Sequence, residues 1–282
     1  MLHFMIRLFC ATGIVFASFG LFYPSIATEV VPHIGNKGQN HYNGKYKNSQ
    51  NHKAFVIAPG GRWQWKSKKQ SADKALKDAL AKCAKQSDYC IPYNVDGELV
   101  FNKESWASVL APYPTIAEME SAATGAKTGN VFPDLSFTSK SGEENFISDY
   151  KGKFVIVNIW ASWCPGCLTE MPSLQKLYDE YKDNPDVQFI TIATMEASSK
   201  SYKFVEGKGF SFPVFHTGIT SKKNRTLPLK SGEETSLDKL GKYVPNTIIL
   251  NKRGQVIFHR IGEFNYWDQF TPQMEHILKN AG

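Results

Sequence analysis

The feature that most constrains the fold of this chain is an apolar run, Phe154–Trp160, which three residues separate from a pair of cysteines. A nearly continuous apolar run of this length is typical of a strand that is buried on both faces. The pair, Cys164-Pro165-Gly166-Cys167, follows at once, and residues 165–182 have the pattern of a helix. The order strand, cysteine pair, helix therefore indicates an α/β protein.

Strand and helix patterns alternate through the rest of the C-terminal half. The expected strands are 187–193, 212–215, 247–250 and 255–261, and the further expected helices are 198–208 and 267–279. The last two strands flank Asn251-Lys252-Arg253-Gly254, a hairpin turn. This order predicts a domain over residues 130–282 with a central mixed sheet flanked by helices.

A small α+β accessory domain is expected at residues 53–102. Its strands are expected at 54–58, 62–66, 90–95 and 98–101, and its helix at 72–84 after an N-cap at Ser71. A Trp-rich strand, an Ala-rich helix and a cysteine pair loosely resemble a module of exported bacterial proteins, which implies no particular function. Residues 103–129 hold several prolines and glycines and are expected to be a connector with a short helix at 115–123.

Residues 1–27 have the pattern of a cleaved secretory signal peptide. Arg7 precedes an apolar run, and Ser25-Ile26-Ala27 places small residues before the expected cut. The alternative is an uncleaved membrane anchor, although the apolar run is short for a span. Loss of this segment would lower the formal net charge from +7 to +6. We interpret this charge as favouring solubility and weak attraction to anionic surfaces, and expect no nucleic-acid partner.

Residues 28–52 are polar and show no apolar period, so they are expected to form a mobile linker. His33, His41 and His52 lie in or beside this segment and could form a metal-binding tail. Their loose spacing favours a solvated linker instead.

The cysteines fall into two local pairs once Cys10 is removed with the signal. An even count in local pairs suits an oxidising compartment, periplasmic or otherwise extracytoplasmic. Cys83 and Cys90 would close a short loop at the end of the 72–84 helix, and we expect them to form a structural disulfide.

Cys164 and Cys167 are the expected catalytic pair of a thiol–disulfide oxidoreductase. A helix N-terminus favours an anion, so the first thiol ionises more easily, and the thiolate is the nucleophile of disulfide exchange. Cys164 is therefore expected to attack, and Cys167, one turn further and less exposed, to resolve the mixed disulfide.

Three other functions of this cysteine pair fit the sequence less well than disulfide exchange. A structural zinc site requires four ligands, and the sequence contains no second CxxC motif that could supply the other two. A copper carrier could use His216 or His259, but each is more simply a strand or surface histidine. Pro165 and the position of Cys167 fit a peroxidatic cysteine poorly. No metal and no cofactor are expected.

The residues around the pair carry a family resemblance. Trp160-Ala161-Ser162-Trp163-Cys164-Pro165-Gly166-Cys167, with Glu170-Met171-Pro172 inside the helix, resembles the TlpA/ResA/DsbE branch of the thioredoxin superfamily over residues 130–282. This resemblance implies a thioredoxin-like fold. It also implies an exported or membrane-tethered protein that reduces disulfides in other exported proteins, including apocytochrome c during cytochrome c maturation. The electrons would come from a DsbD-type membrane protein.

The resemblance also assigns individual residues. Val244-Pro245 matches the family's cis-proline. The alternative is that Pro245 is an ordinary trans proline at the start of a strand. Trp163, Pro165, Val244 and Pro245 would bind substrate. Asn158 replaces the buried Asp of thioredoxins proper, as is usual in this branch, and Glu170 would take part in catalysis. The alternative for Glu170 is a carboxylate that complements the helix dipole.

One segment departs from the family pattern. Residues 217–243 form a longer connection between Phe215 and Val244 than relatives usually have. This inserted loop could contact substrate or be surface decoration. The function hypotheses are a reductase, an oxidase or isomerase that uses the same residues, and a partner-binding adaptor with secondary redox chemistry. The uncharged Pro-Gly dipeptide and the resemblance both favour the reductase.

Overall fold

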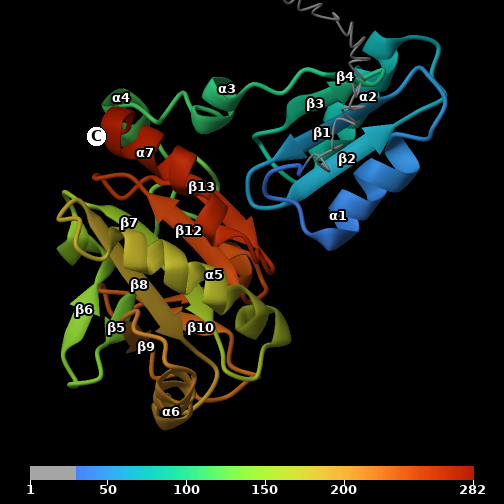
Figure 1. Cartoon of the computed structure of the whole chain (residues 1–282). Coiled ribbons are helices and arrows are strands. Elements are labelled where there is room, and N and C mark those ends of the chain that lie inside the picture. The colour runs from blue at the N-terminus through green and yellow to red at the C-terminus, as the bar shows by residue number, and fades with distance from the viewer. Residues whose placement is uncertain (1–29) are drawn as a thin grey trace, which may run out of the picture. The chain divides into compact units, whose positions relative to one another are not determined.

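The strand predicted to be buried on both faces, β7 (Phe154–Trp160), is an inner strand of a seven-stranded mixed sheet in the computed structural model (Figure 1). β8 (Val187–Ala193) and β9 (Val214–His216) follow it in parallel, and β12 (Asn246–Leu250) pairs with its other edge in antiparallel register. In spatial order the other strands are β13 (Val256–Ile261), β12 (Asn246–Leu250), β8 (Val187–Ala193), β9 (Val214–His216), β5 (Ser136–Thr138) and β6 (Glu144–Phe146). The predicted mixed sheet is confirmed, whereas β5 and β6 were not predicted.

The two faces of this sheet have different partners, because successive residues of a strand point to opposite sides. Phe154 and Ile156 pack with α5 (Pro165–Tyr181) and α7 (Thr271–Asn280). Val155 and Val157 pack instead with the segment before β5 and with residues of the 217–243 insertion. The remaining helical elements of this region are α6 (Ser198–Lys208) and the 3-10 turns η2 (Ile147–Tyr150) and η4 (Trp267–Gln269).

The inserted segment 217–243 is part of the core rather than a plain loop. It forms a hairpin of β10 (Thr226–Pro228) and β11 (Glu234–Ser236), followed by the 3-10 turn η3 (Leu237–Leu240). Leu227, Leu237 and Leu240 are buried against the sheet. Lys, Ser and Gly separate these leucines in the sequence and hide the apolar pattern.

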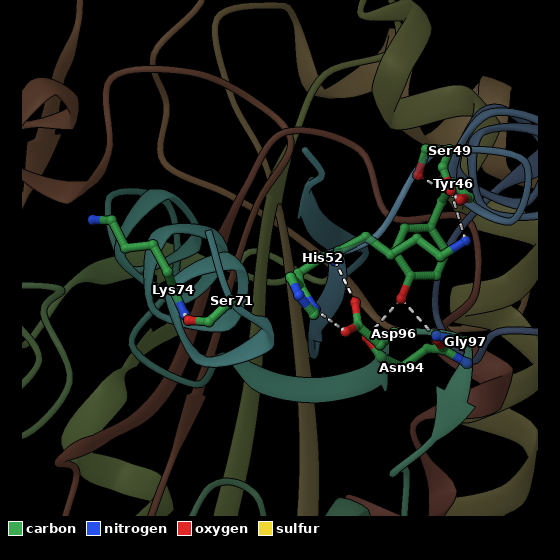
Figure 2. Close-up of polar contacts among 9 residues, drawn as sticks. Tyr46, Ser49, His52, Ser71, Lys74, Asn94, Asp96 and Gly97 are labelled. Carbon is green, nitrogen blue, oxygen red and sulfur yellow. Dashed lines mark hydrogen bonds and ion pairs between the residues drawn. The ribbon is translucent and has the colours of Figure 1, made fainter. Parts of the chain in front are cut away.

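The N-terminal region forms an antiparallel sheet in the order β2-β1-β3-β4. Its strands are β1 (Ala54–Ala58), β2 (Arg62–Lys66), β3 (Ile91–Val95) and β4 (Glu98–Leu99), and its helix is α2 (Ala72–Cys83). The Ser71 hydroxyl caps α2 by accepting the Lys74 N–H at 3.1 Å, as Figure 2 shows. Ala75, Ala79 and Cys83 pack on alternate residues of β1. These predicted elements are confirmed, although β4 is shorter than expected.

The expectation of a mobile linker at residues 28–52 is wrong for the part beyond Val30. Residues 36–46 form a short helix, α1 (Asn36–Asn40), and a π-helix, η1 (His41–Tyr46). Tyr42 and Tyr46 are buried, and the Tyr46 hydroxyl donates to Oδ1 of Asn94 at 2.7 Å (Figure 2). The few apolar residues of this segment are spaced too widely to form a recognisable period, yet each fills a place in the N-terminal core.

His33 likewise lies in the interior and not in a solvated tail. Its N–H donates to Oε1 of Gln269 at 2.9 Å, and its ring Nε2 lies 2.8 Å from the Gln269 carbonyl oxygen. The ring packs edge-on against Trp106 and stacks with Phe270. The N-terminal segment is therefore bonded to the turn that precedes the C-terminal helix.

The connector also takes part in packing. It holds α3 (Lys103–Ala107) and α4 (Ile116–Glu120), the second of which is the predicted short helix. Trp106 of α3 is buried, and its carbonyl accepts a hydrogen bond from Gln273 of α7 at 2.7 Å. Residues Val31–Gly282 together form one compact unit.

The structure describes residues 30–282, so the predicted signal segment 1–27 and Cys10 lie outside the described residues. Within residues 30–282 no helix combines the length and the apolar character that crossing a bilayer requires.

Candidate redox site

Cys164 occupies the N-cap position of α5, where the sequence predicts the attacking thiol. Its backbone is extended (φ −92°, ψ 108°), and Pro165 is the first helical residue, a position at which its missing N–H costs no hydrogen bond. The structure joins Cys164 and Cys167 in a disulfide with Cα atoms 5.3 Å apart. The Cys164 Sγ accepts the Cys167 N–H at 3.2 Å, and Cys164 is 5% exposed while Cys167 is fully buried.

The predicted substrate-binding residues surround this disulfide. Trp163 is 38% exposed and Pro165 is also exposed. The Val244–Pro245 peptide bond is cis, and the Val244 carbonyl oxygen lies 3.5 Å from Cys164 Sγ. A Cβ atom on Gly166 would lie 3.5 Å from Cδ of Pro245, so the cysteine turn and the proline loop are in close approach. The four residues that the resemblance assigned to substrate are thus gathered around one sulfur pair.

Asn158 and Glu170 form a buried polar contact beneath the N-terminal part of α5. The Asn158 amide donates to Oε1 of Glu170 at 2.8 Å and to the Thr247 hydroxyl at 2.8 Å. The backbone N–H of Phe264 donates to the other carboxyl oxygen at 3.1 Å. Burial raises the pKa of the Glu170 carboxyl from its ordinary 4.5 to about 7, against the opposing effect of these hydrogen bonds. Glu170 follows Cys167 by three residues, so both lie on the same face of the helix.

A second buried carboxylate, Glu196, holds the turn that precedes Cys164. Its oxygens accept the Ser162 N–H at 2.8 Å, the Ser162 hydroxyl and the Ser201 hydroxyl. The indole of Trp163 donates to the neighbouring Met195 carbonyl at 3.3 Å. Sequence reasoning missed Glu196, because nothing local distinguishes a glutamate after a strand that meets a turn 34 residues away.

The inserted segment 217–243 contacts the site through the side chain of Lys222. The Lys222 ammonium lies 4.1 Å from the ring centroid of Trp163, within the range of a cation–π contact. Tyr243, the last residue of the insertion, precedes Val244 and is 60% exposed. The insertion therefore contacts Trp163, which precedes Cys164, and leads directly into Val244, whose carbonyl oxygen lies beside the Cys164 sulfur.

Cys83 and Cys90 are joined in a separate disulfide with Cα atoms 6.0 Å apart. It links the end of α2 to the residue before β3, and Cys83 belongs to the apolar cluster between α2 and β1. Cys164 and Cys167 belong to a different cluster, around Trp160. The structure thus keeps the two cysteine pairs apart.

The two histidines considered for copper lie in strands. His216 is buried in β9 with Nε2 3.3 Å from the Ser201 hydroxyl. His259 lies in β13 with Nε2 2.7 Å from the Asn246 side-chain oxygen. Over residues 30–282 the structure contains no group of three or more His, Cys, Asp or Glu side chains placed to hold a metal ion.

The mixed sheet, the cysteine pair at the start of α5 and the cis-proline opposite it define a thioredoxin-like protein. A profile of the Redoxin family matches residues 127–274, just over half of the chain. The thioredoxin-like protein YneN of Bacillus subtilis is 36% identical over 103 residues, which cover 36% of this chain and 59% of YneN. The thiol-disulfide oxidoreductase ResA of Geobacillus kaustophilus is 30% identical over 133 residues, which cover 47% of this chain and 68% of ResA.

The chain belongs to the Redoxin family and, within the thioredoxin superfamily, to the TlpA/ResA/DsbE branch of thiol–disulfide oxidoreductases. The match spans less than two thirds of the length of YneN. Among solved structures, a secreted thiol-disulfide isomerase of Corynebacterium glutamicum is 21% identical with a TM-score of 0.41, covering 51% of this chain and 83% of that one.

Proposed function

We propose that this protein reduces disulfide bonds in other exported proteins. In its dithiol form it would transfer two electrons to a substrate disulfide, leaving two substrate thiols and the Cys164–Cys167 disulfide that the structure contains. The observation that carries this proposal is the position of Cys164. Its sulfur lies at a helix N-terminus and 3.5 Å from the carbonyl oxygen of Val244, and the residues that precede these two in the chain, Trp163 and Tyr243, are exposed.

Each sulfur has a distinct role in the proposed reaction. At the N-terminus of α5 the helix dipole and the Cys167 N–H favour the Cys164 thiolate, which attacks one substrate sulfur and expels the other. Cys167 then attacks Cys164 in the mixed disulfide and releases the second substrate thiol. An extended substrate segment would pair with the backbone of Val244 beside the sulfur.

Glu170 is proposed as the group that accepts the proton of Cys167 during resolution. A carboxyl whose pKa is about 7 holds and releases a proton near neutral pH, which suits a general acid or base. Its burial and its place one helical turn from Cys167 support this assignment.

The direction and the setting of the reaction are also proposals. The family resemblance and the uncharged Pro165-Gly166 dipeptide support a reducing protein. We propose that the chain works outside the cytoplasm after export by residues 1–27, with a DsbD-type electron donor. Cytochrome c maturation is the proposed pathway, on the family resemblance.

Trapping is the experiment that tests the exchange mechanism. Cys167→Ala should accumulate a mixed disulfide between Cys164 and a peptide disulfide substrate. Mass spectrometry should show this adduct as an increase in protein mass by the part of the substrate that stays bound through one sulfur. The matched variant Cys164→Ala should accumulate none. If both variants form the same adduct, or neither does, the proposed roles are wrong.

The reduction potential decides the direction. A reductase is expected to have a potential more negative than about −200 mV, near those of glutaredoxin and thioredoxin. A potential as oxidising as that of DsbA, about −120 mV, would replace the reductase proposal by an oxidase. Full biological activity of Cys164→Ala would favour the adaptor hypothesis instead.

A further inference from the structure

A cleft of about 840 Å³ opens beside the disulfide, between the N-terminal region and the loop after β13. One wall is formed by His33, residues 35–37, Gly61 and Arg62, and the other by residues 260–266 and Tyr243. The cleft adjoins the redox site in two places. Tyr243 precedes Val244, and the Glu263 carboxylate accepts the hydroxyl of Thr169 on α5 at 3.1 Å.

Two arginines from different parts of the chain meet in this cleft. Arg62 of β2 donates from Nη2 to the Ile261 carbonyl at 3.2 Å, and Arg260 of β13 donates to the same carbonyl. Arg260 also donates to the Glu263 carbonyl at 2.7 Å. A guanidinium has five N–H donors, and within residues 30–282 neither arginine has an ion pair with a carboxylate.

Both guanidinium groups are half-buried and only partly satisfied. The Nε atom of each is buried without a hydrogen-bond partner among the described residues. Burial and the charge of Arg62 lower the pKa of Arg260 to about 10, although the nearby Glu170 and Glu263 carboxylates act to raise it, so Arg260 stays charged at neutral pH. Burial also lowers the pKa of Arg62. Two neighbouring cations in partial burial are unfavourable unless an anion joins them, because buried charges need a partner.

The other charged groups of the cleft leave this positive charge in excess. Lys37 on α1 adds a third cation to the lining. Glu263 is the acidic residue of the lining, but its Oε2 is directed to Thr169 and lies 3.3 Å from a Cβ position on Gly166. The carboxylate thus faces α5 and forms no ion pair with either guanidinium.

We propose that Arg62 and Arg260 bind the carboxylate of an acidic side chain in the protein substrate, close in sequence to the disulfide being reduced. This inference rests on the proposed function. An arginine fork matches a carboxylate in geometry and in charge. The occupant is a polypeptide because the cleft continues from the loop that would pair with the substrate backbone, and the rings of Tyr243 and Tyr266 line it. The N-terminal region would thereby select substrates.

The test uses a series of synthetic peptide pairs that all share one internal disulfide. The two members of a pair differ only by Asp or Asn at one position, and this position moves along either side of a cysteine from pair to pair. The pre-reduced protein is mixed with each peptide, and the second-order rate constant of peptide reduction is measured. At the best position the wild-type protein should reduce the Asp peptide about tenfold faster. In Arg62→Gln this ratio should fall close to one, while Arg62→Lys should retain part of it.

Lys66→Gln is the matched control, since it removes one cation from the same strand outside the cleft. It should keep the wild-type ratio. Equal rates for the Asp and Asn peptides in the wild-type protein, or a ratio that Lys66→Gln lowers as much as Arg62→Gln, would overturn the proposal. A wild-type protein that reduces neither peptide would instead contradict the proposed function.

A second measurement holds even if Arg62→Gln does not fold. A cysteine-free peptide that carries the Asp should inhibit reduction of the Asp peptide by the wild-type protein, and its Asn counterpart should inhibit far less. Equal inhibition by the two would refute a carboxylate site.

Discussion

The buried carboxyl of Glu170 should impose a measurable pH dependence on the stability of the oxidised protein. The group is 1% exposed, and burial raises its pKa from 4.5 to about 7. Replacing it in Glu170→Gln removes the titration while keeping an oxygen that accepts the Asn158 amide. The Gln amide would meet the Phe264 N–H donor, which costs stability at every pH and leaves the pH dependence unaffected.

The sign follows from proton binding. Between pH 4.5 and about 7 the folded protein holds a proton on Glu170 that the unfolded chain has released. The free energy of unfolding contributed by this group is therefore fully present below pH 4.5 and is lost as the pH rises to about 7. The loss amounts to about 3 kcal/mol, because each pH unit corresponds to about 1.36 kcal/mol.

Urea unfolding of the oxidised protein, followed by circular dichroism between pH 4 and pH 8, measures this effect. The difference in unfolding free energy, variant minus wild type, should rise by about 3 kcal/mol across that range. His33 and His259, whose pKa values burial lowers to about 4, contribute to both proteins and cancel from the difference. Glu98→Gln, which removes an exposed carboxylate, controls for net charge. A difference that stays constant within about 0.5 kcal/mol would refute the reasoning.

Two further predictions concern the N-terminal region. Tyr46→Phe should lower the free energy of unfolding by about 1–2 kcal/mol in urea titrations, because the buried side chain of Asn94 loses its hydroxyl donor; an unchanged midpoint would show that this hydrogen bond contributes nothing net. Replacing both Cys83 and Cys90 by Ala should cost about 2 kcal/mol, the entropy of a short closed loop. A variant as stable as the wild type would contradict the structural role assigned to that disulfide.

Local signals explain why the core of the redox site was predictable. The apolar run of β7, the proline after Cys164 and the helical pattern of α5 each lie within a few residues of the cysteines. They fix the sulfur at a helix N-terminus without information from distant segments. The cis Val244–Pro245 bond came from the family resemblance and not from the residues themselves.

What the sequence did not reveal depends on contacts between distant segments. β5 and β6 have three residues each, too few for a strand pattern to be recognised. The roles of Glu196 and of the Arg62–Arg260 pair depend on contacts with residues far away in the chain, which no local pattern indicates. In the segment 31–46 isolated apolar side chains are separated by polar residues, so burial is decided by partners such as Asn94.

The hydrogen bonds between His33 and Gln269 bear on where the chain could be divided. They join the segment around His33 to the 3-10 turn η4 that precedes α7, next to Trp106 and Phe270. A fragment that begins at residue 130 would lose these partners and would present Phe270 and its aromatic neighbours to water. The half of the chain that holds Cys164 and Cys167 therefore relies on N-terminal residues to cover part of its apolar surface, and the two halves form one compact unit.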